Sequence, residues 1–170
     1  MVLKVREVRS AREAAWAAQM AWDNWGEDFQ RLTPHKTKAQ LTAFYEAMVA
    51  AGGGGSGGSR GWPACYVAVE GDEPVACAVV DVEDMGVRPD LSPWLANVCV
   101  APGVRGRGYG SALVRAVASS YPLLHLWAIG GGLDRFYGRL GFEPIGRSPL
   151  EGHEEAVTVM RRRGFSRHGL

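Results

Sequence analysis

The residues with the clearest chemical potential are the arginines and glycines between Val98 and Ser111, in the stretch VCVAPGVRGRGYGS. Alternating glycines let the backbone approach a ligand closely and adopt positive φ angles. A helix that begins after such a turn offers unpaired N–H groups and the positive end of its dipole, which together favour phosphate. Arg105 and Arg107 add charge-assisted donors. The stretch therefore predicts a site for a phosphorylated ligand, such as a nucleotide-containing cofactor.

The spacing of these glycines argues against two other phosphate-binding motifs. The run is Gly106-x-Gly108-x-Gly110, whereas dinucleotide-binding folds use Gly-x-Gly-x-x-Gly with an acidic ribose ligand ~20 residues further on. That later position falls in residues 129–131, Ile-Gly-Gly, which hold no carboxylate. No Gly-Lys-Ser/Thr closes the loop, so it is not a P-loop.

The remaining pattern, Arg105-x-x-Gly108-x-Gly110 after a Val-x-Val strand, resembles the acetyl-CoA signature of the GCN5-related N-acetyltransferase (GNAT) family, Arg/Gln-x-x-Gly-x-Gly/Ala. A second match lies one helix and one strand further on. There the stretch from Phe136 to Phe142 fits the family's Phe-Tyr-x-x-x-Gly-Phe in register. Two motifs in the right order make a chance match improbable.

The resemblance implies an N-acetyltransferase that moves an acetyl group from acetyl-CoA to a primary amine of a small molecule or peptide by direct transfer. Acetyl-CoA would be a co-substrate, and no metal is expected. The positions that match the family's cofactor site are Val98, Cys99, Val100, Arg105, Gly106, Arg107, Gly108, Tyr109, Gly110 and Ser111.

The resemblance also implies a proton donor, the phenol of Tyr137, which would protonate the departing sulfur as general acid. Many relatives carry a glutamate base on the strand before the glycine loop, but Trp94–Val100 contains none. The base is then either a water chain, which Asn97 would help to hold, or a carboxylate elsewhere, such as Asp81, Glu83 or Asp84. The sequence leaves these alternatives open.

Aromatic residues near the N-terminus are candidates for the acceptor site, because in this fold the first helical pair covers the acceptor side. Trp22, Trp25 and Phe29 would wall the acceptor pocket, and Asn97 would contribute from the strand. The alternative is that the tryptophans only pack the helix onto the sheet. A rival function also follows from the missing strand glutamate, namely a non-catalytic CoA-binding regulatory or sensor module.

Composition places the chain among globular proteins of one domain. It has 170 residues, 46% hydrophobic content and a net charge of +1. Neither a membrane-spanning run nor a signal-peptide block is visible, so we expect a cytoplasmic protein without a membrane partner, monomeric or homodimeric. The basic residues near the C-terminus are typical of a solvated end, so no nucleic-acid partner is expected. Cys65, Cys77 and Cys99 lie in apolar runs and are expected to be buried thiols.

The elements expected to position these residues alternate along the chain. Residues 1–163 would form one domain with a flexible Gly/Ser segment at 52–59, followed by a basic tail at 164–170. The fold implied is the α/β GNAT fold, a mixed, mostly antiparallel sheet of about six to seven strands flanked by about four helices. We expect strands at Val2–Val8, Ala64–Glu70, Val75–Val82, Trp94–Val100, Leu123–Ala128, Pro144–Arg147 and Ala156–Met160, and helices at 10–21, 37–50, after Gly110 and around Phe136.

Overall fold

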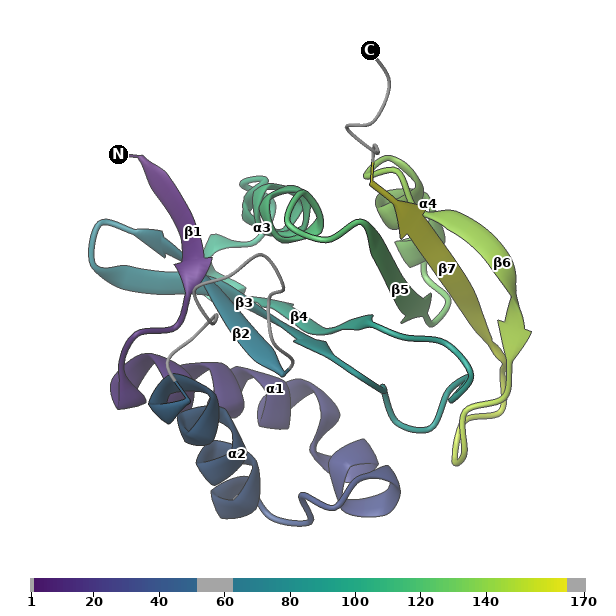
Figure 1. The fold of residues 1–170 in the computed structure, drawn as a ribbon, viewed down its shortest axis with the longest axis horizontal. Helices are drawn as coiled ribbons and strands as arrows, with labels where there is room; N and C mark the ends of the chain where they lie inside the picture. The colour runs from purple at the N-terminus through teal and green to yellow at the C-terminus, as the bar shows by residue number, and fades with distance from the viewer. Residues whose placement is uncertain (1, 52–62, 165–170) are drawn as a thin grey trace.

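The computed structural model describes residues 2–51 and 63–164 (Figure 1). The predicted Gly/Ser segment and all but the first residue of the predicted tail lie outside these ranges. The elements are β1 (Leu3–Glu7), α1 (Ala11–Leu32), α2 (Lys38–Ala50), β2 (Ala64–Glu70), β3 (Glu73–Asp81), β4 (Trp94–Val100), η1 (Pro102–Val104), α3 (Tyr109–Ala118), β5 (Leu123–Ala128), α4 (Leu133–Gly138), β6 (Glu143–Ser148) and β7 (Val157–Arg163).

Within the described residues, seven strands form one sheet in the order β1-β2-β3-β4-β5-β7-β6. Neighbouring strands run antiparallel except β4 and β5, which are parallel. This is the mixed, mostly antiparallel sheet expected from the sequence, and the fold prediction is confirmed. The central strands β2 and β3 read as nearly continuous apolar runs because both of their faces are buried.

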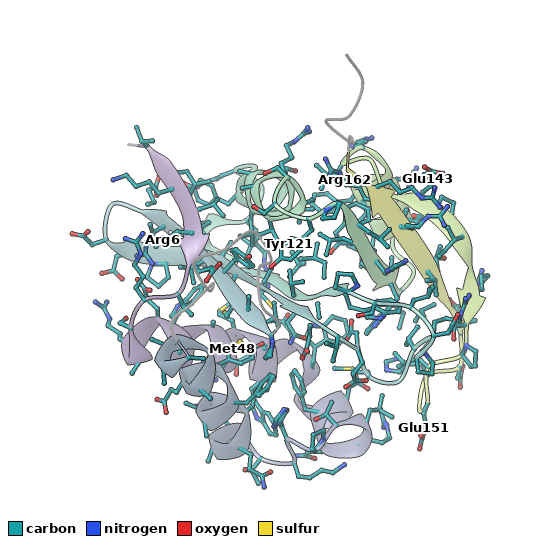
Figure 2. All side chains as sticks on the ribbon, viewed as in Figure 1. Arg6, Met48, Tyr121, Glu143, Glu151 and Arg162 are labelled. Atoms are coloured by element: carbon teal, nitrogen blue, oxygen red, sulfur yellow. The ribbon has the colours of Figure 1, made fainter. Side chains whose placement is uncertain are left out.

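Helices cover both faces of the sheet and enclose two hydrophobic cores (Figures 1 and 2). The α1/α2 core contains Leu41, Tyr45 and Met48 of α2 together with the alanine stripe of α1. The α3/α4 core contains Leu113 of α3 and residues of α4 on the opposite face. Alternate residues of the central strands β2 and β3 enter one core or the other, as the two-residue period of a strand requires.

The first helix is longer than the sequence predicts. It was expected to end near residue 21 but continues to Leu32 through a kink at Trp25, where φ is −133° and ψ is 15°. The helix continues because Asp28 and Phe29, beyond the kink, are still buried. A side-chain atom on Gly26 would lie 3.2 Å from the Trp22 ring, so this glycine lets the second half of the helix pack closely.

The C-terminal arginines correct a second expectation. The sequence predicts a last strand that ends at Met160, but Arg161–Arg163 form the end of β7 and pair with β5. Arg162 Nη1 donates to the carbonyl oxygen of Ala118 at 2.9 Å.

Burial of the three cysteines is confirmed. Among the helices of the described residues, none has the length and apolar character needed to cross a membrane.

Candidate active site

The sheet opens between β4 and β5. Within the described residues these two strands share a single register pair, Trp94 with His125, and the His125 N–H donates to the Pro93 carbonyl at 2.9 Å. Beyond that pair the strands part (Figure 1). The apolar runs that predict these two strands give no sign of this opening.

A β-bulge in β4 lies beside the opening. Val79 pairs with Ala96 and Cys77 pairs with Cys99, so two residues of β4, Asn97 and Val98, oppose a single residue of β3. Asn97 has a φ of +53°, a left-handed conformation that asparagine tolerates better than most residues. Its side chain donates to the hydroxyl oxygen of Tyr45 at 3.0 Å. Bulges commonly redirect the backbone next to functional sites.

A cavity of about 100 Å³ fills this opening and reaches both faces of the sheet. Trp25, Trp127 and Ile129 reach it from the α1/α2 core. Leu126 and Tyr137 reach it from the α3/α4 core. The complete lining is Trp25, Asp84, Leu95, Ala96, Asn97, Val98, Leu126, Trp127, Ile129, Leu133 and Tyr137.

Tyr137 lies on α4 at the edge of the α3/α4 core. Its ring contacts those of Phe136 and Phe142 edge-on, with centroids 5.0 and 5.9 Å away. Burial raises the pKa of the phenol well above its usual range, and the negative potential of Cys99 and Asp84 adds to this effect. The hydroxyl is therefore protonated at neutral pH and able to donate a proton.

Asp84 is the carboxylate that the fold brings to the cavity. It is 9% exposed, and burial raises its pKa to about 8, with smaller contributions from Glu83 and Asp81. The indole of Trp127 favours the ionised form. Of the other two carboxylates that the sequence left open, Glu83 is exposed and accepts a hydrogen bond from the Gly86 N–H. Neither Glu83 nor Asp81 is among the residues that line the cavity.

The predicted cofactor loop connects β4 to α3 and combines several features suited to phosphate. Gly106 and Gly108 have φ angles of +77° and +81°, and no atom lies within 4 Å of where a side chain would begin. Gly108 caps α3, so the first N–H groups of the helix point toward the loop. Arg105 Nε donates to the Val100 carbonyl at 3.0 Å, which ties the loop to β4.

The two sequence motifs meet at Gly110. A side-chain atom there would lie 3.3 Å from Val100 and 3.8 Å from Phe136. The first residue of α3 is anchored separately, because the Tyr109 hydroxyl donates to the Glu70 carboxylate at 2.7 Å. Val98 and Val100 pack against the α3/α4 core, whereas Cys99 belongs to the α1/α2 core.

The residues predicted for the acceptor site separate into two groups. Trp25 and Asn97 line the cavity. Trp22 lines a separate hollow on the outside of the α1 kink, and Phe29 is buried in the α1/α2 core with its ring stacked on Trp22 at 6.3 Å. Sequence reasoning did not select Trp127, whose ring meets Trp25 edge-on at 5.4 Å. The one sequence signal that could have identified Trp127 is its position near the end of the strand Leu123–Ala128, just before the glycines.

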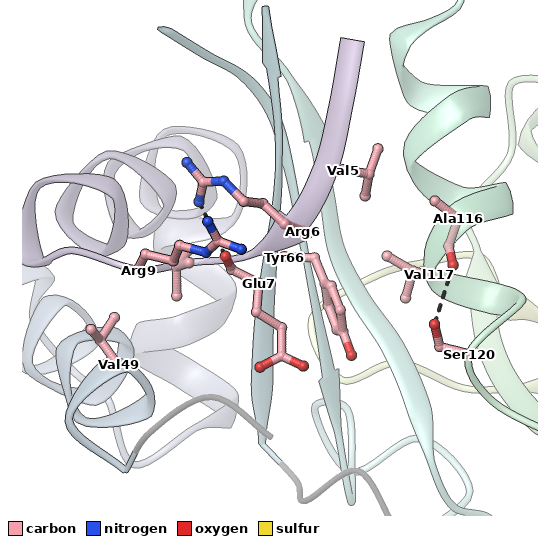
Figure 3. A pocket seen from close by; sticks show the side chains of 10 residues that line it. Val5, Arg6, Glu7, Arg9, Val49, Tyr66, Ala116, Val117 and Ser120 are labelled. Carbon is pink, nitrogen blue, oxygen red and sulfur yellow. Dashed lines mark hydrogen bonds between the residues drawn. The ribbon is translucent and has the colours of Figure 1, made fainter. Parts of the chain in front are cut away.

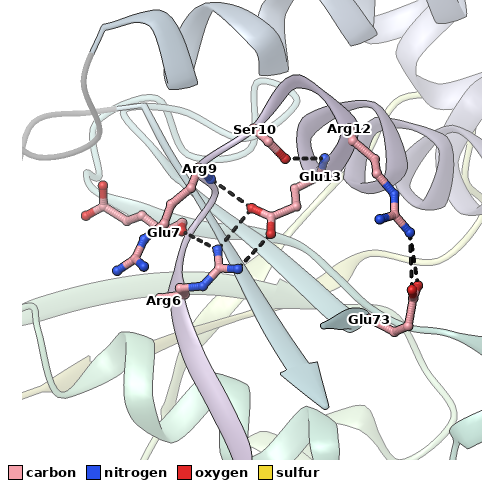
Figure 4. A network of polar contacts seen from close by, with 7 residues as sticks. All are labelled: Arg6, Glu7, Arg9, Ser10, Arg12, Glu13 and Glu73. Carbon is pink, nitrogen blue, oxygen red and sulfur yellow. Dashed lines mark hydrogen bonds and ion pairs between the residues drawn. The ribbon is translucent and has the colours of Figure 1, made fainter. Parts of the chain in front are cut away.

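A larger groove of about 560 Å³ lies away from this opening, between β1 and α3 (Figure 3). Arg6, Arg9 and Ser120 are among its lining residues, and none of the predicted site residues is. Arg6 belongs to a structural network in which its guanidinium holds Glu13 in the first turn of α1 (Figure 4). The smaller cavity is the better candidate, because Asp84, Tyr137 and the strand that leads into the glycine loop, β4, all line it.

The described residues contain no group of three or more His, Cys, Asp or Glu side chains able to hold a metal ion. The site therefore combines an opening through the sheet, a glycine-rich loop beside it and two buried ionisable side chains that line the cavity, Asp84 and Tyr137. Residues 61–144 match the sequence profile of the acetyltransferase (GNAT) domain. The chain belongs to the GNAT family of acetyl-CoA-dependent N-acetyltransferases.

Solved structures share the whole fold. A histone acetyltransferase HPA2-related protein of Corynebacterium glutamicum is 22% identical, with a TM-score of 0.67 over 99% of this chain and all of its own. The Vibrio cholerae spermidine/spermine N-acetyltransferase SpeG is 14% identical, with a TM-score of 0.64 over 95% of this chain and 92% of its own.

The aminoglycoside acetyltransferase AAC(6')-Ib, solved with paromomycin and acetyl-CoA, is 17% identical, with a TM-score of 0.63 over 96% of this chain and 94% of its own. At these identities the likeness establishes the fold alone. A comparison with curated proteins finds no significant match.

Proposed function

We propose that the protein transfers an acetyl group from acetyl-CoA directly to the primary amine of a small molecule or peptide, with Tyr137 as general acid and Asp84 as general base. The observation that carries this proposal is the cavity between β4 and β5, which is lined from both cores of the protein. Two substrates that approach from opposite faces of the sheet can meet there without a covalent enzyme intermediate. The solved complex of AAC(6')-Ib with acetyl-CoA and an amine-containing antibiotic supports this arrangement by analogy.

The donor side is the α3/α4 face. The loop of Arg105, Gly106 and Gly108 would hold the pyrophosphate, since its glycines leave room for close approach and α3 begins there. Backbone N–H groups of β4 after the bulge would polarise the thioester carbonyl. The buried phenol of Tyr137 would give its proton to the sulfur as the carbon–sulfur bond breaks.

The acceptor side is the α1/α2 face. An amine is an ammonium ion at neutral pH and must lose a proton before its nitrogen can attack the carbonyl carbon. A carboxyl group whose pKa is about 8 is well matched to accept that proton near neutral pH. Asp84 then replaces the strand glutamate of other family members, and the water-chain alternative is not needed.

The direct test is the release of CoA from acetyl-CoA with a panel of primary amines, together with calorimetric titration of acetyl-CoA. We expect turnover with at least one amine and 1:1 binding of acetyl-CoA. Binding without turnover across the whole panel would instead support the alternative, a non-catalytic CoA-binding regulatory or sensor module. Turnover that falls strongly, but measurably, in Asp84→Asn and is kept in Asp81→Asn would support the base assignment.

A further inference from the structure

The cavity is small, and the one side chain in its described lining that can carry a charge near neutral pH is acidic, Asp84. Among the described residues that line it, Asp84 and Tyr137 are the only ionisable ones. No arginine, lysine or histidine is among those lining residues to neutralise an anionic group on the acceptor. Asp84 acts as a base only in its ionised form, and a carboxylate attached next to the reacting nitrogen would then meet a like charge in a buried place, where like charges repel strongly. The amine comparisons below are therefore made above pH 8, where Asp84 is ionised.

The walls restrict shape as well as charge. Trp25 and Trp127 meet edge-to-face with an interplanar angle of 82°, and Ile129 lies on the same side. The cavity volume of about 100 Å³ is smaller than the ~150 Å³ of an engineered apolar cavity that admits benzene. The transferring acetyl group must share this space. A ring or a branch beside the nitrogen would have to share this space with the acetyl group and the two indole rings, so we expect both to be disfavoured.

We infer that the acceptor is an unbranched primary amine, a –CH₂–NH₂ group on an apolar chain with no anionic group on the carbon that bears the nitrogen. This inference rests on the proposed function and narrows its acceptor from primary amines in general. The ammonium form is attracted by Asp84, and the tryptophan faces favour a cation and the adjoining methylene groups. Free α-amino acids and amines on branched carbons are excluded.

A series of three small amines separates the two restrictions. Pentylamine has the proposed shape, 2-aminohexane adds one methyl branch beside the nitrogen, and norleucine replaces that methyl group by a carboxylate. We expect kcat/KM to fall by at least ~10-fold from pentylamine to 2-aminohexane, within the usual range for one extra carbon in a tight pocket. A further fall of about 100-fold to norleucine follows from charge repulsion.

Variants test which side chain causes each restriction, Trp25 for the shape of the acceptor and Asp84 for its charge. Trp25→Ala should narrow the ratio between pentylamine and 2-aminohexane, whereas Trp22→Ala should leave it unchanged, because Trp22 lines only the outer hollow of the same helix. Asp84→Asn should narrow the ratio between 2-aminohexane and norleucine, although both rates fall. Each ratio is measured within one protein preparation, so a loss of folded protein cancels.

A kcat/KM for norleucine within about tenfold of that for pentylamine would overturn the inference. An equal kcat/KM for 2-aminohexane and pentylamine would do the same. Turnover of polyamines with none of pentylamine would overturn it too, in favour of an acceptor held by acidic residues of the outer hollow, such as Asp23 and Glu27. If no amine is acetylated while acetyl-CoA still binds, the proposed function itself fails. The outcomes are therefore distinguishable.

Discussion

Trp94 and His125 form the one register pair between β4 and β5 within the described residues, and their rings lie 5.7 Å apart. Trp94 is fully buried, and the His125 ring nitrogen Nδ1 lies 3.2 Å from the Pro93 carbonyl oxygen. This pair acts as the closed end of the opening, because the strands separate beyond it. The candidate active-site cavity depends on two strands that pair at one end and separate at the other.

The first prediction concerns the proposed proton donor. Tyr137→Phe keeps the ring and its packing against Phe136 and Phe142 but removes the only proton the side chain can give. General acid catalysis contributes ~10²–10⁴-fold, and a thiolate can also leave unassisted, so we expect kcat to fall toward the lower end of that range. Acetyl-CoA affinity should change little.

The control for this variant is Tyr121→Phe, which removes a buried hydroxyl outside the cavity. Its kcat should match that of the native enzyme. If Tyr137→Phe retains full kcat while the chemical step limits the rate, Tyr137 is a packing residue.

The second prediction is a pH dependence set by Asp84. A base works in its deprotonated form, so kcat/KM should rise with pH through about 8, the value to which burial raises the pKa of this group. In Asp84→Asn, kcat/KM should no longer show the rise that is due to Asp84, and it should rise with pH only because the amine substrate loses its proton. Asp81→Asn and Glu83→Gln serve as matched controls, since neither side chain lines the cavity. An unchanged profile in Asp84→Asn would remove Asp84 from the mechanism.

The same group makes a third prediction about stability. The pKa of Asp84 is about 8 in the folded protein and near ~3.9 when unfolded, so the folded state binds more protons between these values. The free energy of unfolding should therefore fall as pH rises from about 4 to about 8. The Tm of Asp84→Asn should therefore rise relative to that of the native protein as pH increases across this window. A constant difference between the two would contradict the raised pKa.

The fourth prediction tests the cofactor loop. Gly108 has a φ of +81°, a conformation that β-branched residues strongly disfavour, and open space faces it. Gly108→Val should weaken acetyl-CoA binding in calorimetric titration at fixed salt while leaving the core intact. Gly103→Ala, also open but without a positive φ, is the matched control and should bind normally. Equal affinity in a folded Gly108→Val protein would refute the loop assignment.

The fifth prediction concerns the entry to α1 (Figure 4). Glu13 accepts two hydrogen bonds from the Arg6 guanidinium at 2.7 and 3.0 Å and one from the Arg9 N–H at 2.8 Å. The Arg6 contact lowers the pKa of Glu13. Its contribution is therefore present above the unfolded pKa and is lost as pH falls through the folded one.

Glu13→Gln should destabilise the protein by about 1 kcal/mol in urea unfolding at pH 7, allowing for screening by solvent. Glu73→Gln, which breaks the far more exposed pair with Arg12, should change stability by less than about 0.5 kcal/mol. Similar effects from both variants would mean that the Arg6–Glu13 geometry adds nothing beyond an ordinary surface pair.

The sequence by itself predicted the fold class, through the order of its elements and the family resemblance, and the backbone geometry of the glycine loop, which depends on local chemistry. Trp94–Val100 and Leu123–Ala128 have the bounds predicted from apolar runs that end at proline or glycine. Gly106 and Gly108 adopt the positive φ angles that their spacing suggested. The end of α1 was missed, because the burial of Phe29 in the tertiary structure outweighs the local effect of Gly26.

Only the tertiary structure decided which side chains share the cavity. Asp81, Glu83 and Asp84 are carboxylates within four positions of one another, and only Asp84 lines the cavity. Burial raises the pKa of both aspartates, but Asp84 is the more deeply buried of the two. Trp22 and Trp25 lie on one helix, and the kink between its halves sends only Trp25 toward Trp127, more than a hundred residues away in sequence. Such contacts arise from the packing of distant elements across a parted sheet, and no local pattern encodes them.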